Sequence, residues 1–308
     1  MTSSTGRVYK TQLRCAKIVS KIEPKIIEQI AEAGYDGVEC TDTSLSLAEA
    51  REARRICELN GIRIHSVMRG AQFNNAERVE SDTEALRNAI RVAAAYGAST
   101  VLCVPGSAPA PNLKPENFRI SFNPETLEVT RVCEGDNTPH AEYIAAQNHA
   151  TRCAQEGLPK VLDVAAYEGV RICLENVWNN LWCDPALLNA FIRSFGSPWV
   201  GSYFDLGNFV KYQPTENWLT VLGKGIIFKL HFKDFLVDHS LPNSGTFVPV
   251  GHGSNDWVKI RDILEDLEYN GFVTIEFEES ESTKLSDKQQ VQKFHNFFAG
   301  VDILKGVE

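Results

Sequence analysis

Cysteine occurs in this chain without any cysteine motif. The eight cysteines are scattered singly, with no C-x-x-C pair and no regular framework. This spacing gives no sign of a disulfide scaffold. Cys15, Cys40, Cys103 and Cys173 lie inside apolar runs, where we expect reduced, buried thiols.

Long apolar runs are also missing. No run reaches the roughly 18 apolar residues that a membrane span needs, and residues 1–6 lack the apolar core of a secretory signal. We therefore expect a cytoplasmic protein without a membrane partner. An export signal already removed from a mature form stays open.

The sequence has no excess of positive charge. Its formal net charge is −9, and an acidic balance argues against a broad nucleic-acid surface, so we expect no nucleic-acid partner. No G-x-G-x-x-G or G-x-x-x-x-G-K-[ST] segment follows a predicted strand. The usual nucleotide-binding signatures are therefore absent.

What the chain does have is a nearly continuous alternation of strand and helix patterns. Eight of each are predicted, without an internal repeat or a domain linker. A length of 308 residues suits one large α/β barrel or two smaller domains. Because eight alternating units occur without a phosphate loop, we predict a closed (β/α)₈ TIM barrel, a single domain over residues 1–308.

The predicted elements follow from apolar runs, turn residues and helix-start signals. The first strands are expected at 12–19, 37–40, 62–68 and 100–104. Helices are expected at 24–34, 46–59, from a capping box at Ser81 to Gly97, and at 139–168, 184–195, 215–223, 256–269 and 286–304.

A long insertion after the fourth strand interrupts the alternation. Residues 105–138 carry five prolines or glycines before Asn123-Pro124-Glu125-Thr126, where a turn would join strands 118–122 and 127–132. We predict a small hairpin there. We hypothesise that it forms part of the pocket wall or a contact with a partner subunit.

Four polar residues each end a short apolar run in the second half of the chain. They are Glu175, Asp205, His231 and Glu276, and the first two intervals, of 30 and 26 residues, are close to one strand-plus-helix unit. In a barrel of this kind the active site lies at the carboxyl ends of the strands. The four side chains are therefore expected to converge on one face.

Three carboxylates and one imidazole in one place predict a divalent metal site. Burying the carboxylates together is unfavourable unless a cation or protons compensate their repulsion. The ligand set suits Mn²⁺, Mg²⁺, Co²⁺ or Zn²⁺, and the lack of cysteine among the ligands argues against a structural zinc site. The alternative is that each residue is only a turn or cap residue after its strand.

Further polar residues near these strand ends are expected to contact a substrate. Asn179 follows Glu175, Asn208 follows Asp205, and Lys233 shares strand parity with Lys229 and His231. A surface pair between Lys233 and Asp234 is the alternative for that lysine.

Three further residues are weaker candidates for substrate contact. Glu39 ends the second strand, His65 lies in the third strand, and His252 lies between two glycines in the loop after the seventh. A buried histidine with satisfied hydrogen bonds is the alternative for His65.

These residues resemble those of the sugar phosphate isomerase/epimerase group of xylose isomerase-like TIM barrels. The superfamily also holds ketose 3-epimerases, hydroxypyruvate isomerases, inosose dehydratases and apurinic endonucleases. The resemblance covers nearly the whole chain. Its most specific parts are Glu175-Asn176, Asp205-Leu206-Gly207-Asn208 and His231-Phe232-Lys233-Asp234, with further matches at 33–39, 95–98, 251–257 and 275–276.

The resemblance implies a function as well as a fold. It implies that Glu175, Asp205, His231 and Glu276 bind one divalent metal ion, and that Glu175 and Glu276 also move the proton, one from each face of the sugar. The expected activity is a metal-dependent isomerase or epimerase of a sugar or sugar phosphate, working through an enediolate. Since oligomers are common in the family, a homo-oligomer is open.

Two positions depart from the ketose 3-epimerases. Those enzymes commonly carry a histidine where this chain has Asn208, and an arginine where it has Val237. The departures argue against 3-epimerisation of a free ketohexose, and the Asp-x-Gly-Asn form looks more like the sugar phosphate and uncharacterised branches.

Three other functions compete with the leading one. A dehydratase of a keto-polyol would use the same site, because the same enediolate can expel a β-hydroxyl. An apurinic endonuclease would need more clustered histidines than the seven scattered here, and a basic face. A barrel that binds sugar without catalysis is the third.

Overall fold

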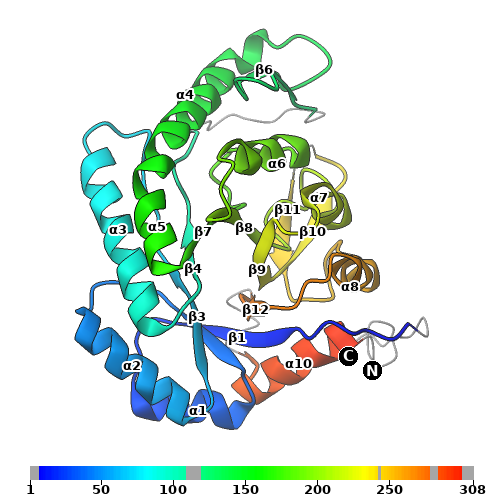
Figure 1. The fold of residues 1–308 in the computed structure, drawn as a ribbon. Helices are drawn as coiled ribbons and strands as arrows, with labels where there is room; N and C mark the ends of the chain where they lie inside the picture. Colours follow the sequence, from blue (N-terminus) through cyan, green and yellow to red (C-terminus); the bar gives the residue numbers. More distant parts are fainter. Residues whose placement is uncertain (1–6, 109–118, 242–243, 278–283, 300–308) are drawn as a thin grey trace.

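The computed structural model describes residues 7–108, 119–241, 244–277 and 284–299 of the chain. Its centre is a set of eight short strands (Figure 1). Their bounds are Arg14–Val19 (β1), Gly37–Cys40 (β2), Arg63–Met68 (β3), Thr100–Cys103 (β4), Arg171–Glu175 (β7), Val200–Asp205 (β8), Ile227–Phe232 (β9) and Phe272–Ile275 (β12).

The eight strands form a closed parallel barrel. Each pairs with the next along the chain, and β12 pairs with β1 to close the ring. The predicted (β/α)₈ TIM barrel with an insertion after its fourth strand is confirmed. One domain over the whole of residues 1–308 stays a prediction, because both ends of the chain lie outside the described residues.

Helices surround the barrel (Figure 1). Amphipathic sequences explain their position, because each buries one apolar stripe against the strands; in α6, for example, Leu187, Leu188 and Phe191 are buried. The helices are Pro24–Ala33 (α1), Leu47–Leu59 (α2), Val79–Tyr96 (α3), Ala141–Gly157 (α4), Leu162–Glu168 (α5), Pro185–Ser194 (α6), Thr215–Leu222 (α7), Trp257–Asp266 (α8) and Asp287–Ala299 (α10), with 3₁₀ turns at Thr138–His140 and Leu158–Val161.

The strand register fixes which polar side chains meet. Asp205 on β8 is paired with His231 on β9, and Glu175 on β7 is paired with Tyr203 on β8. Glu276 directly follows the last residue of β12, and its backbone N–H donates to Phe232 at the end of β9. Four predicted ligands therefore reach the same level at the carboxyl ends of four neighbouring strands.

Two helix predictions were wrong, one in where a helix begins and one in treating two helices as a single helix. Helix α3 begins before Ser81, at Val79, because the Asp82 carboxylate binds the Gln72 N–H at 2.9 Å and Arg78 at 3.2 Å and so supports an earlier turn. The predicted helix 139–168 is broken at Leu158–Val161. Pro159 explains the break, since a proline has no N–H to donate and its ring clashes with the preceding turn.

The insertion contains the predicted hairpin in a shorter form. Its strands are Ser121–Phe122 (β5) and Val129–Arg131 (β6), antiparallel, and residue 118 lies outside the described part of the chain. The hairpin is fixed to α4 by two hydrogen bonds between the Asn148 amide and the backbone of Val129, at 2.7 and 3.0 Å. A role in the pocket wall or in a subunit contact stays a hypothesis.

A second hairpin was not predicted. Asp234–Asp238 (β10) and Ser244–Val248 (β11) pair antiparallel directly after β9. The sequence of this segment mixes glycine, serine and exposed apolar residues, which gives no clean two-residue alternation.

The core and the cysteines agree with the sequence analysis. Cys15, Cys40, Cys103 and Cys173 are buried and all eight cysteines are free. Among the described residues, none of the helices combines the length and the apolar composition that a bilayer crossing requires.

Candidate metal centre

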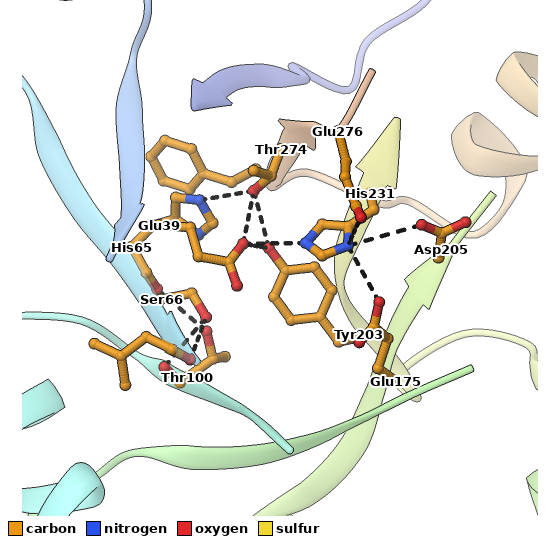
Figure 2. Close-up of polar contacts among 12 residues, drawn as sticks. Glu39, His65, Ser66, Thr100, Glu175, Tyr203, Asp205, His231, Thr274 and Glu276 are labelled. Carbon is orange, nitrogen blue, oxygen red and sulfur yellow. Dashed lines mark hydrogen bonds and ion pairs between the residues drawn. The ribbon is translucent and has the colours of Figure 1, made fainter. Parts of the chain in front are cut away.

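Glu175, Asp205, His231 and Glu276 converge at the carboxyl end of the barrel (Figure 2). One ligand atom from each lies within 4.8 Å of the others. The Nδ1 atom of His231 is 2.8 Å from Glu276 Oε2, 3.4 Å from Glu175 Oε1 and 3.8 Å from Asp205 Oδ2. Ligand atoms around a bound divalent ion lie about 3.0–3.5 Å apart, given metal–ligand distances of about 2.0–2.2 Å.

Three buried atoms of this cluster face only one another. Asp205 Oδ2, His231 Nδ1 and Glu276 Oε2 are inaccessible to solvent, and apart from the ion-pair contacts among the four ligands they have no hydrogen-bond partner. Buried polar atoms are almost always satisfied, so three atoms without a partner outside the cluster mark a place for a bound cation. The residues fit a divalent metal by geometry and by donor chemistry.

The imidazole of His231 is held from behind by Glu39. Its Nε2 lies 3.2 Å from Glu39 Oε2, on the side of the ring away from the other ligands. Glu39 is fully buried and also accepts hydrogen bonds from the hydroxyls of Tyr203 and Thr274. A carboxylate in this position fixes the tautomer of a metal-binding histidine, leaving Nδ1 free to bind.

His65 does not contact the four ligands directly and is joined to Glu39 through the hydroxyl of Thr274. Its Nε2 is 3.1 Å from Thr274 Oγ1, and its ring stacks on Phe272 with centroids 4.4 Å apart. Burial lowers the pKa of His65 well below its usual value, and the nearby Lys229 and His231 add to the effect. The ring is therefore neutral. The structure thus brings Glu39 and His65 under the metal centre, inside the barrel.

Asp205 is held by its neighbours in the chain. The side-chain amide of Asn176 bonds both backbone groups of Asp205, donating to its carbonyl at 2.9 Å and accepting from its N–H at 2.7 Å. The Asp205 Oδ1 atom accepts from the N–H groups of Gly207 and Asn208 at 2.7 and 2.6 Å. These contacts use one carboxylate oxygen and leave Oδ2 facing the cluster.

Glu276 lies between two cationic groups. Its Oε1 accepts from Lys233 Nζ at 2.9 Å, while Oε2 faces His231. Burial alone would raise its pKa, but His231 and Lys233 outweigh burial and lower the pKa to about 2. With its side chain 31% exposed, against 1% for His231, this carboxylate is ionised and open to the barrel mouth.

The metal-free cluster retains protons at neutral pH. Burial raises the pKa of Asp205 to about 7, since the attraction of Lys233 does not fully compensate. For His231, burial acts to lower the pKa, but Glu39, Glu175 and Glu276 outweigh it and raise the pKa well above the usual value. A bound cation has to displace these protons.

Lys233 does not form the surface pair with Asp234 that was the alternative. Asp234 is buried, and its Oδ2 accepts from the N–H groups of Gly251 and Gly253 at 2.9 and 3.1 Å and from Trp257 Nε1 at 3.3 Å. It therefore anchors the glycine loop after the second hairpin. A side chain on Gly253 would meet the Asp234 carboxylate at 2.1 Å, so this residue has to be glycine.

The other predicted substrate contacts lie at varying distances from the cluster. His252 is exposed, and its side chain makes no hydrogen bond with a described residue. The Asn179 amide is used within the protein, donating to Gly106 at 3.0 Å and accepting from Leu181 at 3.1 Å. Asn208 is buried beside Asp205. Substrate contact by these residues stays a prediction.

An aromatic wall lies beside the cluster. Trp178 is 43% exposed and stacks on Phe247 of β11 with centroids 4.8 Å apart. The Nζ atom of Lys233 lies 4.5 Å from the centre of the Phe247 ring.

The local sequence patterns did not reveal the contacts of Tyr203 and Thr274 with Glu39, or the role of Asn176. Strand parity would have pointed to the first two residues, because Tyr203 and Thr274 stand two residues before Asp205 and Glu276 and so face the same interior one layer down. The role of Asn176 depends on a backbone contact between strands, which no local pattern shows.

Comparison with known proteins gives the same architecture. No curated protein sequence matches the chain significantly. A xylose isomerase domain protein from Planctomyces limnophilus superposes with a TM-score of 0.65 at 16% identity, over 95% of this chain and 97% of that one. D-psicose 3-epimerase from Clostridium cellulolyticum, solved with D-tagatose, gives a TM-score of 0.64 at 14% identity, over 94% and 99%.

A third similar structure holds a metal. The IolI protein with a bound zinc atom superposes with a TM-score of 0.63 at 16% identity, over 94% of this chain and 98% of that one. At such identities the likeness establishes the fold alone. The sequence model of the xylose isomerase-like TIM barrel family matches residues 27–298, and the chain belongs to that family.

Proposed function

We propose that this protein is a divalent-metal-dependent isomerase or epimerase of a sugar or sugar phosphate, working by proton transfer through an enediolate. The single observation that carries the proposal is the cluster at the strand ends, with four ligand atoms within 4.8 Å of one another and three buried atoms that have no partner outside the cluster. A divalent ion held there supplies Lewis-acid polarisation of a substrate carbonyl and its neighbouring hydroxyl.

Glu175 and Glu276 are the proposed proton carriers. They come from β7 and from the end of β12, the two outer strands of a four-strand arc that has β8 and β9 between them. In Figure 2 they approach His231 from two sides. Two carboxylates that flank a bound sugar can remove a proton on one face and return it on the other, which is epimerisation.

The remaining ligands have a different task. Asp205 is fully buried and His231 is 1% exposed, so neither reaches a substrate as well as the two glutamates do. We assign them to metal binding alone. Mn²⁺, Mg²⁺, Co²⁺ and Zn²⁺ all suit one imidazole with three carboxylates, and the similar IolI structure contains zinc.

Lys233 has the best position among the predicted substrate contacts. Its side chain is 16% exposed, and its ammonium group bonds the proposed base Glu276. It therefore stabilises the ionised carboxylate and presents positive charge to an oxygen on which negative charge develops. Trp178 and Phe247 offer an apolar surface for the C–H face of a sugar.

Hydrogen exchange from solvent tests the proposal. The metal-loaded protein is incubated with a panel of ketoses, aldoses and their phosphates in D₂O, and deuterium at the carbon next to the carbonyl is followed by NMR. We expect exchange and an isomer or epimer with at least one substrate. Glu276→Gln should lower the exchange rate by about 10²–10⁴-fold while metal is kept at saturating concentration.

The matched control is Glu28→Gln, which changes an exposed carboxylate on α1 in the same way. Its exchange rate should equal that of the wild type. Full activity of Glu276→Gln would remove Glu276 from the mechanism. Loss of water from the substrate, detected as a deoxy product, would assign the site to a dehydratase instead.

A further inference from the structure

A cavity lies at the opposite end of the barrel from the metal centre. Its volume is about 470 Å³, and six of its lining residues are the first residues of barrel strands. These are Arg14 on β1, Arg63 on β3, Thr100 on β4, Arg171 on β7, Ile227 on β9 and Phe272 on β12. We call this cavity the N-terminal mouth.

The N-terminal mouth is basic, although the chain is acidic. Its lining includes five cationic side chains and one carboxylate, in a protein of net charge −9. The carboxylate of Glu268 is already paired with Lys224 at 2.6 Å. Among the described residues, no carboxylate forms an ion pair with Arg14, Arg63, Arg171 or Lys229.

Lys229 is the most deeply buried of these cations. It is 7% exposed, lies two residues before His231 on β9, and makes no hydrogen bond with a described residue. Its one ring contact is with Phe272, at 5.2 Å. Its ammonium group forms no ion pair with a described carboxylate, and the attraction of Glu39 only partly offsets the cost of burying it.

Two of the three arginines at the mouth, Arg14 and Arg171, are oriented by ring contacts and not by ion pairs with carboxylates. The guanidinium of Arg171 lies 4.5 Å from the Phe228 ring and that of Arg14 lies 5.6 Å from the Phe272 ring. The Arg171 Nε atom donates to the Pro198 carbonyl at 3.3 Å, which also fixes its direction. Such contacts hold the planar groups while most of their N–H donors stay free for an anion.

We propose that the N-terminal mouth binds a phosphate monoester of small-molecule size. Guanidinium forks recognise phosphate oxygens in pairs, and several cations that line one cavity match a dianion better than a monovalent carboxylate. The volume is that of a small-ligand pocket and leaves room for an organic group beside the phosphate. The site is separate from the metal centre, which lies at the other end of the strands, and it does not depend on the proposed reaction.

Calorimetric titration of the full-length, Mg²⁺-loaded protein tests the proposal. The probes are inorganic phosphate, glycerol phosphate and, as a neutral control, glycerol. We expect saturable binding of both phosphates and none of glycerol, with glycerol phosphate bound at least as tightly as inorganic phosphate. Arg14→Gln and Arg171→Gln should each weaken binding by about tenfold or more.

Two matched controls locate the anion. Lys233→Gln removes a cation at the metal centre and Lys259→Gln removes an exposed cation on α8; both should leave the phosphate affinity within about twofold of the wild type. No saturable binding by the wild type would overturn the proposal. Loss of binding in Lys233→Gln with full binding in the two arginine variants would also overturn it, because the anion would then lie at the metal centre.

Thermal unfolding distinguishes a variant that has lost the phosphate site from a variant that fails to fold. Phosphate should raise the melting temperature of the wild type and of Lys233→Gln, but not of Arg14→Gln or Arg171→Gln. An equal rise in all four proteins would contradict a site at the N-terminal mouth.

Discussion

At the scale of single residues, the metal centre depends on side chains that do not reach the metal. Glu39 binds the far nitrogen of His231, and Asn176 holds the backbone of Asp205. Tyr203 and Thr274 in turn hold Glu39. The orientation of each ligand is therefore set by a buried neighbour, as is usual for metal-binding histidines and carboxylates.

The first residue-scale prediction concerns Glu39. Glu39→Gln keeps the size of the side chain but removes the negative charge that favours donation from His231 Nε2. We expect a fall of about tenfold in metal affinity, the lower end of what such neighbours contribute. Competition with a chelating dye measures it. An affinity equal to that of the Glu28→Gln control would show that Glu39 does not orient the ligand.

The four ligands were predictable from sequence, and their supporting residues were not. Glu175, Asp205, His231 and Glu276 each end an apolar run, which is a local signal. Glu39 and His65 stood out as polar residues of strands, but their contacts cross the barrel interior. Such contacts join residues more than 190 positions apart in the chain, so no local pattern reveals them.

At the scale of elements, the hairpin of β10 and β11 is the part of the active end that the sequence did not reveal. It begins directly after Lys233 and carries Phe247 to the side of Trp178. Asp234 connects the hairpin to the glycine loop and to Trp257. One buried carboxylate thus fixes three segments near the metal centre.

Replacing Asp234 tests that connection. Asp234→Ala leaves the N–H groups of Gly251, Gly253 and Trp257 without their acceptor, so the free energy of unfolding should fall by about 2–3 kcal/mol. Denaturant unfolding measures the change. Asp238→Ala is the control on the same strand, because its carboxylate bonds only the exposed Ser240 among described residues. Equal stabilities of the two variants would contradict the anchoring role.

Element boundaries followed the local signals where those signals were strong. The predicted strand 37–40 matches β2, and Ser46 caps α2 with Glu49 as a capping box. The prediction at Ser81 placed the start of α3 two residues too late, because Asp82 uses its carboxylate to bind Gln72 in the preceding loop and so does not mark the helix start. The break near Pro159 was readable from the sequence, but the prediction continued the helix through it.

At the scale of the whole molecule, the barrel separates two kinds of charge. Carboxylates gather at the carboxyl ends of the strands, and unpaired cations gather at the amino ends. Between them lie Glu39, Tyr203, Thr274 and His65, joined by hydrogen bonds. The acidic end fits a cation and the basic end fits an anion.

The protonation of the acidic end makes metal binding dependent on pH. In the metal-free protein the raised pKa of His231 and the pKa of about 7 for Asp205 keep protons on atoms that a metal needs. Metal binding must release those protons, so the affinity should rise with pH through this range and fall below it. The Glu276 carboxylate contributes little to the change, because its pKa is lowered to about 2.

The most direct measurement is a calorimetric titration of the metal-stripped protein with Mn²⁺ at about pH 6 and about pH 8, in buffers of different ionisation enthalpy. We predict one ion per chain, tighter binding at the higher pH, release of protons to the buffer, and loss of binding in Asp205→Asn and His231→Gln. Absence of binding, or equal binding by these two variants and the wild type, would contradict the assignment of the four residues to a metal centre.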